Sequence, residues 1–365
     1  MAAEVYIFNP DNDMALAKGD ANYIAPAFAA RLTCDLEPLM AWCMPPGALL
    51  VVHDVAVVEP WLAELRERYG VAVKAIGIDE LPRSGNFHPW GWSPTLRRLL
   101  LKRGVSAACL PTEDELVRWR GLSHRRTSIV FHEQVRRAMS ERFAPAPVEL
   151  RTAEEVTSFA VAHPGCYVKL PWSASGRGVW HVHDAHGRDF AAWLRGGLSR
   201  YGSVLCEVGV DRVLDFAIEF ECRAGEARPV GLSLFSCDAH NQFSHAVVAT
   251  DATLRRRIAS RYPRFDLLEG ALTRVVNEVM SPVYEGPLGV DLLLGNLDGE
   301  CVVNPCVEVN LRMTMGMITS RLGNLLMSGD NVATFRVGEA SAVPRDALLL
   351  TPLYAGTRHA AWLEH

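Results

Sequence analysis

The chain has 365 residues, of which 49% are hydrophobic and 22% are charged, and its formal net charge is −5. This length predicts two or three domains, and the charge excludes the strongly basic surface typical of nucleic-acid-binding proteins. The nine cysteines are scattered and form no Cys-x-x-Cys pair, which favours reduced thiols over a disulfide framework. No apolar run reaches the length of a membrane span, and the first residues lack a signal-peptide pattern. We therefore expect a cytoplasmic protein without membrane or nucleic-acid partners.

The first part of the chain predicts alternating strands and helices. The expected elements are strands at 4–8, 48–58 and 71–78, and helices at 60–69, 95–103 and 113–119. Such alternation is typical of a parallel, doubly wound sheet, which is an α/β arrangement. The first strand is followed by the polar loop Asn9-Pro-Asp-Asn-Asp13 and not by a Gly-x-Gly-x-x-Gly turn, which argues against a Rossmann-type dehydrogenase.

From about residue 121 onward the pattern changes, and strands dominate after residue 203. The expected helices are at 128–142, from Thr152 onward and at 266–280, and the expected strands are at 166–170, 179–182, 203–208, 213–222, 229–235, 245–249, 287–294 and 301–311. The helix after Thr152 is predicted by the capping-box pattern Thr152-Ala-Glu-Glu155. The last 25 residues are expected to form a loose C-terminal segment.

The first candidate site is the stretch Tyr167-Val-Lys-Leu-Pro-Trp-Ser-Ala-Ser-Gly-Arg-Gly178. An apolar strand carries Lys169, stops at a proline and continues into a loop of small residues from Ser173 to Gly178. Glycines allow backbone N–H groups to approach phosphate oxygens, and a lysine adds a compact positive charge. Because the lysine precedes the loop, the stretch is not a Walker A motif. An ordinary hairpin remains the alternative interpretation.

The second candidate site is the stretch Cys306-Val-Glu-Val-Asn-Leu-Arg312. Its strict alternation places Glu308, Asn310 and Arg312 on one face of a strand. Carboxylate and amide oxygens are suitable ligands for Mg²⁺, and the arginine can pair with phosphate or with a developing oxyanion. The alternative is the solvent-exposed face of an edge strand, although the segment that follows, Met313-Thr-Met-Gly-Met317, is an apolar turn of small residues unlike a solvent-exposed rim.

Further acidic residues precede this stretch. Asp291 lies alone in an apolar run, where a carboxylate is costly to bury without a cation. A hairpin over the turn 296–299 would bring it next to Glu308. Glu207 ends the strand 203–208, and the strand at 215–221 alternates between an apolar face and an acidic face, which is expected to be solvent-exposed.

Taken in chain order, the lysine with its small-residue loop, the strand-ending glutamate, the isolated aspartate and the Glu-x-Asn-x-Arg pattern resemble the motifs of the ATP-grasp superfamily over residues 121–325. The resemblance implies an ATP-grasp fold with α+β lobes at 121–202 and 203–340, a Rossmann-like domain at 1–120 that could contact substrate, and a C-terminal segment at 341–365. It also implies an ADP-forming ligase that uses ATP and Mg²⁺, with Mn²⁺ as an alternative metal. The substrates would be a small carboxylate and an amine or thiol, joined through an acylphosphate, and a homodimer would be a candidate assembly.

The resemblance also implies roles for particular residues. Lys169 and Arg312 are the implied catalytic residues, and Asp291, Glu308 and Asn310 are the implied metal ligands. The implied ATP-binding residues are Arg125, Arg126, Lys169, Ser173, Ala174, Ser175, Gly176, Arg177, Gly178, Glu207, Val208 and Asp215. The superfamily has a lysine where this chain reads Ser123-His-Arg-Arg126, so that Arg125 or Arg126 would replace it. The candidate substrate contacts of the first domain are Asn9, Asp13, Asn22 and Tyr23.

Two other functions remain open at this point. The first is a kinase on the same fold, which would release a phosphorylated acceptor where a ligase releases an amide. The second is a non-catalytic ATP-binding regulatory protein, which would have no need to keep three metal ligands.

Overall fold

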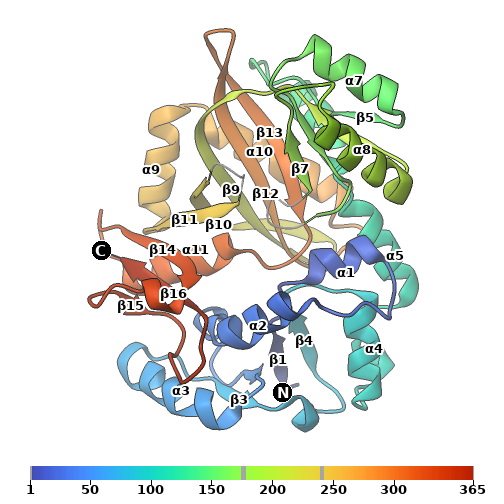
Figure 1. Cartoon of the computed structure of the whole chain (residues 1–365). Helices are drawn as coiled ribbons and strands as arrows, with labels where there is room; N and C mark the ends of the chain where they lie inside the picture. Colours follow the sequence, from blue (N-terminus) through green and yellow to red (C-terminus); the bar gives the residue numbers. More distant parts are fainter. Residues whose placement is uncertain (1, 174–177, 239–241, 365) are drawn as a thin grey trace.

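The structure is a computed structural model that describes residues 2–173, 178–238 and 242–364. These residues form one four-stranded sheet near the N-terminus, a second four-stranded sheet and an eight-stranded sheet. In Figure 1 the N-terminal domain lies at the bottom, the small lobe that contains β5 to β8 lies at the upper right, and the large lobe built on the eight-stranded sheet lies at the upper left and along the left side.

The N-terminal sheet has the strand order β3-β2-β1-β4, and all of its strand pairs are parallel. Its elements are β1 (Glu4–Ile7), α1 (Asn12–Lys18), α2 (Ala27–Leu36), β2 (Leu49–Val51), α3 (Val55–Tyr69), β3 (Lys74–Ile76), β4 (Asn86–Pro89) and α4 (Pro94–Lys102), with short 3₁₀ helices at Glu37–Cys43, Ile78–Glu80 and Ala107–Cys109. The predicted parallel α/β sheet is therefore confirmed. The strand predicted at 48–58 is wrong beyond Val51, because the Asp54 carboxylate accepts the N–H of Val57 and starts helix α3 at Val55.

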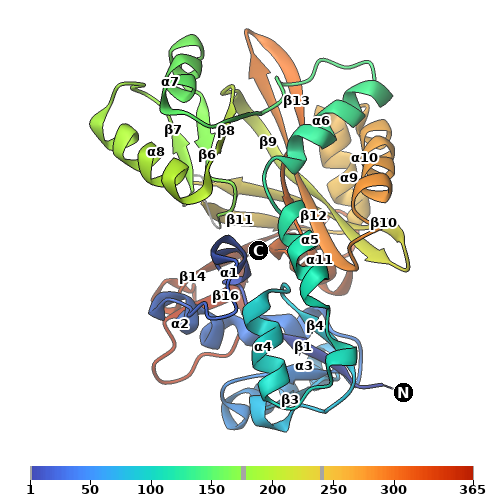
Figure 2. The ribbon, with the colours of Figure 1, turned by 90° about the vertical axis from the view of Figure 1, so that its right-hand side faces the viewer.

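The small lobe is an antiparallel sheet in the order β5-β8-β6-β7. Its elements are β5 (Val148–Leu150), α7 (Ala153–Ala162), β6 (Tyr167–Lys169), β7 (Val179–His181), α8 (Arg188–Tyr201) and β8 (Val204–Glu207). The predicted capping box at the start of α7 is confirmed, since the side chains of Thr152 and Glu155 each bond to the other's backbone N–H. Figure 2 shows α7 and α8 on the outer side of this sheet, where Val156 and Leu194 pack against Val168.

The large lobe is the eight-stranded sheet in the order β13-β12-β9-β10-β11-β14-β16-β15. Its strands are β9 (Asp211–Arg223), β10 (Glu226–Cys237), β11 (Phe243–Val248), β12 (Gly286–Leu297), β13 (Glu300–Asn310), β14 (Ala333–Glu339), β15 (Leu348–Leu349) and β16 (His359–Glu364). Its helices are α5 (Glu113–Leu122), α6 (Thr127–Ala138), α9 (Asp251–Arg261), α10 (Phe265–Val279) and α11 (Met315–Leu326), with a 3₁₀ turn at Ala340–Ala342. One apolar core holds these parts together: the fully buried Phe216, Ile218 and Phe220 of β9 pack with residues of α5, α6 and α10.

The predicted hairpin between β12 and β13 is confirmed, and its register pairs Asp291 with Glu308. The turn is Asp298-Gly299, where both residues have positive φ (54° and 79°). A two-residue Asp-Gly turn of this kind matches the twist of the flanking strands. The hairpin therefore brings two carboxylates that are 17 positions apart onto neighbouring strands.

Two expectations about the last third of the chain are wrong. The segment 313–317 is not a turn, because the Thr314 hydroxyl accepts the N–H of Met317 and starts helix α11. The last 25 residues are not loose either. Strand β16 pairs along its length with β14, and residues 360–363 are buried, because the apolar side chains of this strand complete the core between the sheet and the N-terminal domain. No helix of the described ranges combines the length and apolar character needed to cross a membrane.

Candidate functional site

The predicted metal ligands lie together at the β12–β13 edge of the large sheet. The register places Glu308 opposite Asp291, and it places Asn310 opposite Gly289. Asn310 Nδ2 donates a hydrogen bond of 3.1 Å to Asp291 Oδ2. Because residues two apart in a strand share a face, the three side chains project from the same side of the sheet.

Arg125 joins this edge to the small lobe. Its Nη2 donates to both carboxylate oxygens of Glu308, at 2.9 and 3.0 Å. Its Nη1 donates to the carbonyl of Leu170 and to the hydroxyl of Ser173, at 2.8 and 2.6 Å. Since its side chain is only 4% exposed, the guanidinium is fixed between the loop after β6 and the carboxylate of β13. The paired donors of an arginine fit a carboxylate or a phosphate in this way.

Arg126 points elsewhere, although it is adjacent in sequence. Its side chain is half-exposed and pairs with Glu149 at 3.2 Å, and its Nη2 lies 2.9 Å from Nε2 of His124. The structure thus distinguishes two arginines that the sequence left equivalent: Arg125 contacts Glu308, whereas Arg126 contacts Glu149.

Lys169 and Glu207 form a nearly buried ion pair on the small-lobe sheet. Their side chains are 8% and 10% exposed, and Nζ lies 2.7 Å from Oε2. They are diagonal neighbours on adjacent strands, because Tyr167 pairs with Glu207 and Lys169 pairs with Leu205. The strand pairing thus explains why the predicted lysine and the predicted strand-ending glutamate meet.

The buried thiol of Cys306 connects the two lobes electrostatically. Burial raises its pKa well above the usual range, and the carboxylates of Asp291, Glu207 and Glu308 raise the pKa further, whereas Lys169 lowers it. Charges that act on one thiol must lie around it, because Coulomb interactions weaken with distance. The ion pair of the small lobe and the carboxylates of the large lobe therefore lie near enough to act on the same thiol.

Glu219 is a site residue that the sequence did not single out. It lies on β9 opposite Gly289, on the acidic face that was expected to be solvent-exposed, yet it is only 1% exposed. Its Oε2 accepts a hydrogen bond of 2.9 Å from the hydroxyl of Thr314. A Cβ on Gly289 would lie 2.7 Å from the same oxygen, and a Cβ on Gly316 would overlap the carboxylate. Two glycines that are distant in sequence thus make the space for this side chain, which is why alternation alone could not reveal its burial.

Burial raises the pKa values of two neighbouring acids of the site. Burial, followed by the charge of Glu308, raises the pKa of Asp291 to about 7. Burial, followed by the charge of Asp291, raises the pKa of Glu219 to about 8. Clustered acids with raised pKa values are typical of functional sites, because a protein gains no stability from burying them.

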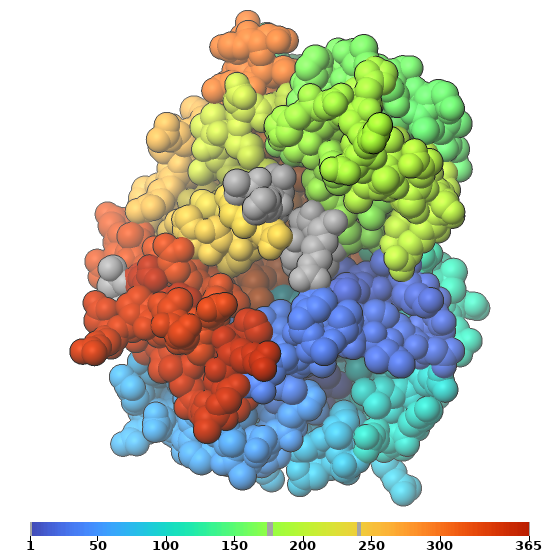
Figure 3. Space-filling model, in the orientation of Figure 1, coloured from blue at the N-terminus to red at the C-terminus, as the bar shows by residue number. Residues whose placement is uncertain are grey.

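The N-terminal domain contributes Asp13 to this site. Nε and Nη2 of Arg312 both lie 2.8 Å from Asp13 Oδ2, and Nη2 also donates to Asn310 Oδ1 at 3.0 Å. The next residue, Met313, donates its backbone N–H to the carbonyl of Trp90 at 2.7 Å. Asp13 and Trp90 follow the carboxyl ends of β1 and β4, which is where open α/β sheets bind ligands. Figure 3 shows the blue N-terminal part, the green small lobe and the yellow-to-red large lobe meeting on one face of the molecule.

The other predicted substrate contacts have partners within the N-terminal domain. Asn9 exchanges two hydrogen bonds with the backbone of Gly91, at 2.8 and 3.3 Å, which ties the β1 loop to the β4 loop. Asn22 is exposed and bonds to Asp20 and to Arg98. Tyr23 is half-buried beside Asp11. Burial, followed by the charge of Asp11, raises the pKa of the Tyr23 hydroxyl.

The remaining predicted nucleotide contacts lie in or beside the small lobe or on β9. Asp215 is on β9 and pairs with Arg212, and Val208 directly follows β8. Gly178 packs against Ser173, and a Cβ at this glycine would overlap that side chain. Ala174, Ser175, Gly176 and Arg177 lie outside the described residues.

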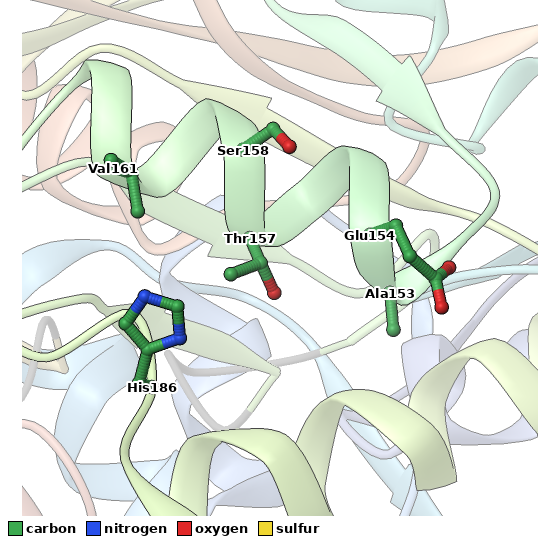
Figure 4. Close-up of a pocket in the computed structure, with 6 residues that line it drawn as sticks. All are labelled: Ala153, Glu154, Thr157, Ser158, Val161 and His186. Carbon is green, nitrogen blue, oxygen red and sulfur yellow. The ribbon is translucent and has the colours of Figure 1, made fainter.

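Two surface hollows lie away from this site. One, of about 550 Å³, is lined by one face of α7 and by His186, on the outer side of the small lobe (Figure 4). The other, of about 610 Å³, lies between α2 and the C-terminal strands and is lined in part by Arg31 and Arg358. No residue of the predicted site lines either hollow. Within the described ranges, no three His, Cys, Asp or Glu side chains gather as a metal cluster. The candidate metal site therefore depends on two carboxylates and one amide.

Comparison with solved structures identifies the architecture. Biotin carboxylase from Campylobacter jejuni, in a complex with β-γ-ATP, superposes with a TM-score of 0.53 at 12% identity, over 100% of this chain and 87% of the other. The chain has the ATP-grasp fold. N5-carboxyaminoimidazole synthetase from Staphylococcus aureus, complexed with ADP, gives 0.51 at 10% identity, over 100% and 93%. The biotin carboxylase domain of 2-oxoglutarate carboxylase from Hydrogenobacter thermophilus, with MgADP, ADP and bicarbonate, gives 0.53 at 11% identity, over 100% and 86%. No protein-family model and no curated protein matches the sequence.

The ATP-grasp fold accounts for the full length of the chain, because both the N-terminal sheet and the two lobes are included in these superpositions. The predicted fold is thereby confirmed. At these identities the similarity defines the fold alone, and the chemistry has to be argued from the side chains.

Proposed function

We propose that this protein is an ATP-dependent ligase that joins a small carboxylate to an amine, or to a thiol, through an acylphosphate. The observation that supports it most is that charged side chains of both lobes approach one another. The large lobe contributes Asp291 and Glu308, whereas Lys169 is on the small lobe and Arg125 links the two. Complexes of proteins with the same fold contain β-γ-ATP, ADP or MgADP, which supports nucleotide binding by this fold.

The donor set fits a hard divalent cation. Asp291, Glu308 and Asn310 would hold Mg²⁺, or Mn²⁺ in its place, since all three offer oxygen ligands. The pKa of Asp291 is raised by burial and by Glu308, and a cation between the two carboxylates would offset both effects. When bound, the metal would neutralise charge on the phosphates of the nucleotide.

The chain's own residues supply positioning and charge. Lys169 and Arg125 are placed to bind phosphate oxygens, and both now contact carboxylates that a phosphate would compete with. The loop 173–178 would cover the phosphates, and Glu207 with Val208 would meet the adenine and ribose. Correct placement of reactants and charges supplies most of the rate in phosphoryl transfer.

The proposed chemistry has two steps. A substrate carboxylate oxygen attacks the γ-phosphorus, and ADP leaves. An uncharged amine nitrogen then attacks the acyl carbon, phosphate leaves, the nitrogen releases a proton to solvent, and an amide forms. Arg312 would stabilise negative charge on the transferred group or on the tetrahedral intermediate, and its bond to Asp13 places that charge beside the N-terminal domain, where the substrates would bind.

The test is ADP release by the purified protein with ATP, Mg²⁺ and pools of amino acids and small carboxylic acids. We expect Lys169→Ala and Glu308→Ala to reduce ADP release at least 100-fold on any substrate found in this way. Arg142→Ala, at an exposed ion pair with Glu300, should keep the wild-type rate. Wild-type rates in both site variants would refute the site assignment.

The products separate the proposal from its nearest competitor. A phosphorylated acceptor that accumulates without amide formation would show a kinase on the same fold. Calorimetry that detected no Mg²⁺-dependent ATP binding would refute both enzymatic functions.

A further inference from the structure

Strand β13 changes register just before the candidate metal ligands. Leu293 pairs with Asn304, but Asp291 pairs with Glu308, so that the single residue Leu292 stands opposite three residues of β13. Without this bulge, the register of the first half of the strand would place Cys306 opposite Asp291. Glu308 would then be displaced by two residues along the strand, which is about 7 Å. The bulge therefore decides which side chain meets Asp291.

The side chain of Asn304 closes the bulge. Its Oδ1 accepts the backbone N–H of Cys306 at 3.1 Å, a group inside the bulge. Pro305, the first residue of the bulge, has no N–H to be satisfied, which is typical of prolines inside sheets. Because Asn304 is only 6% exposed, water is a poor substitute for its bonds.

A residue of helix α6 also hydrogen-bonds to this asparagine. His132 of α6 is fully buried, and its Nε2 lies 2.9 Å from Asn304 Oδ1. The backbone N–H of Cys306 can only donate, so the amide must present its oxygen, and His132 Nε2 must carry a proton. Burial lowers the pKa of this histidine to about 4, which keeps the imidazole neutral, and its Nδ1 has no partner among the described residues.

Helix α6 and the residues that flank it thereby contact β13 at three levels. Arg125, just before the helix, pairs with Glu308, and His132 pairs with Asn304. Beyond the end of the helix, residues 142–144 bond to the backbone of Val303. The two elements run in opposite directions, and Figure 2 shows α6 beside β13. The His132–Asn304 contact lies between the two others, at the residue where the register shift begins.

We propose that His132 and Asn304 are positioning residues for the metal-binding edge, and that their contact fixes the bulge which brings Glu308 to Asp291. The inference rests on the proposed function, because it assigns these residues to the metal ligands of that site. Neither residue touches the ligands' oxygen atoms. Supporting residues of this kind typically change metal affinity 10- to 100-fold.

The test measures by calorimetry the Kd of ADP in the presence of Mn²⁺ and in the presence of EDTA. The Kd in EDTA divided by the Kd in Mn²⁺ reports how much the metal strengthens binding. We expect His132→Leu and Asn304→Leu to reduce this ratio about 10-fold or more, while the Kd in EDTA changes less than about threefold. His132→Gln should restore the ratio to within about threefold, because a glutamine amide can donate to the same oxygen. Should the leucine variants not fold, Asn304→Ser, which is too short to reach both donors, is used with the same expected loss.

A matched control is Asn277→Leu. Asn277 of α10 is half-buried and, like Asn304, bonds to a strand backbone, here to the N–H and the carbonyl of Ala227, both at 2.9 Å. The Asn277→Leu variant should unfold at a lower urea concentration, as the other variants do, but keep the wild-type ratio of the ADP Kd values in EDTA and in Mn²⁺. Folded variants of His132 and Asn304 that keep the ratio, or a control that loses it equally, would overturn the inference. A wild-type protein without any Mn²⁺ effect on ADP binding would instead refute the proposed function.

Discussion

Glu219→Gln should abolish one large component of the pH dependence of stability. The pKa of this carboxyl is raised from 4.5 to about 8, first by burial and then by Asp291. Below pH 4.5 the group is protonated in both the folded and the unfolded protein, and it contributes no difference. Between pH 4.5 and 8 the unfolded chain ionises while the folded chain keeps its proton, so the free energy of unfolding falls as pH rises.

The size of the effect follows from the pKa difference. A shift of about 3.5 units at about 1.4 kcal/mol per unit corresponds to an upper limit of about 5 kcal/mol. The glutamine has the same shape and no proton to lose. The variant should therefore be about as stable as the wild type near pH 4.5. Its free energy of unfolding should then exceed that of the wild type by about 1.4 kcal/mol more for each further pH unit, and the difference should stay constant above pH 8.

The assay is urea unfolding followed by tryptophan fluorescence from pH 5 to 9, in EDTA, for variant and wild type together. Glu226→Gln on β10 is the control, because this exposed carboxylate pairs with Arg228 and its pKa is lowered, so the stability difference between this variant and the wild type should not change above pH 6. If the difference between Glu219→Gln and the wild type is constant from pH 5 to 8, the group is not buried as an acid and the argument fails.

Two further substitutions test the packing of the site. Arg125→Lys cannot keep both bonds to Glu308. We expect it to weaken Mg²⁺-dependent ATP binding, measured by calorimetry, by about 10- to 100-fold, whereas Arg126→Lys should change this binding by less than about threefold. Equal losses would mean that Arg125 is not the arginine that faces the nucleotide. Gly316→Ala would place a methyl group against the buried carboxylate of Glu219 and should destabilise the protein by about 1–3 kcal/mol in urea unfolding. Gly196→Ala, in open space on α8, should be neutral or stabilising by up to about 1 kcal/mol. A neutral Gly316→Ala would show that the carboxylate is free to move.

The local part of the site was accessible from the sequence. Alternation along β13 places Glu308 and Asn310 on one face, and the Asp-Gly turn makes the hairpin that pairs Glu308 with Asp291. These features depend on periodicity and turn chemistry, which act over a few residues. The same is true of the capping box that starts α7.

Other elements could not be predicted because their partners are distant. Helix α11 begins at Thr314 in a segment that looks like a turn, and the apolar residues of β16 give no signal of the strand β14 with which they pair. Short apolar segments fit a helix, a strand or a turn equally well until a neighbouring surface selects one of them. The secondary structure of the C-terminal part was therefore decided by packing.

The sequence by itself determined that a lysine precedes a small-residue loop and that carboxylates and an amide alternate on a later strand, because both patterns are written in consecutive residues. Only the tertiary structure decided that Arg125 and not Arg126 reaches Glu308, 183 positions away, and that Glu219 is buried between Gly289 and Gly316. The physical reason is that charge pairing and burial depend on which side chains approach in space. That approach is set by the packing of sheets and helices, whereas a local pattern fixes only the direction in which a side chain points.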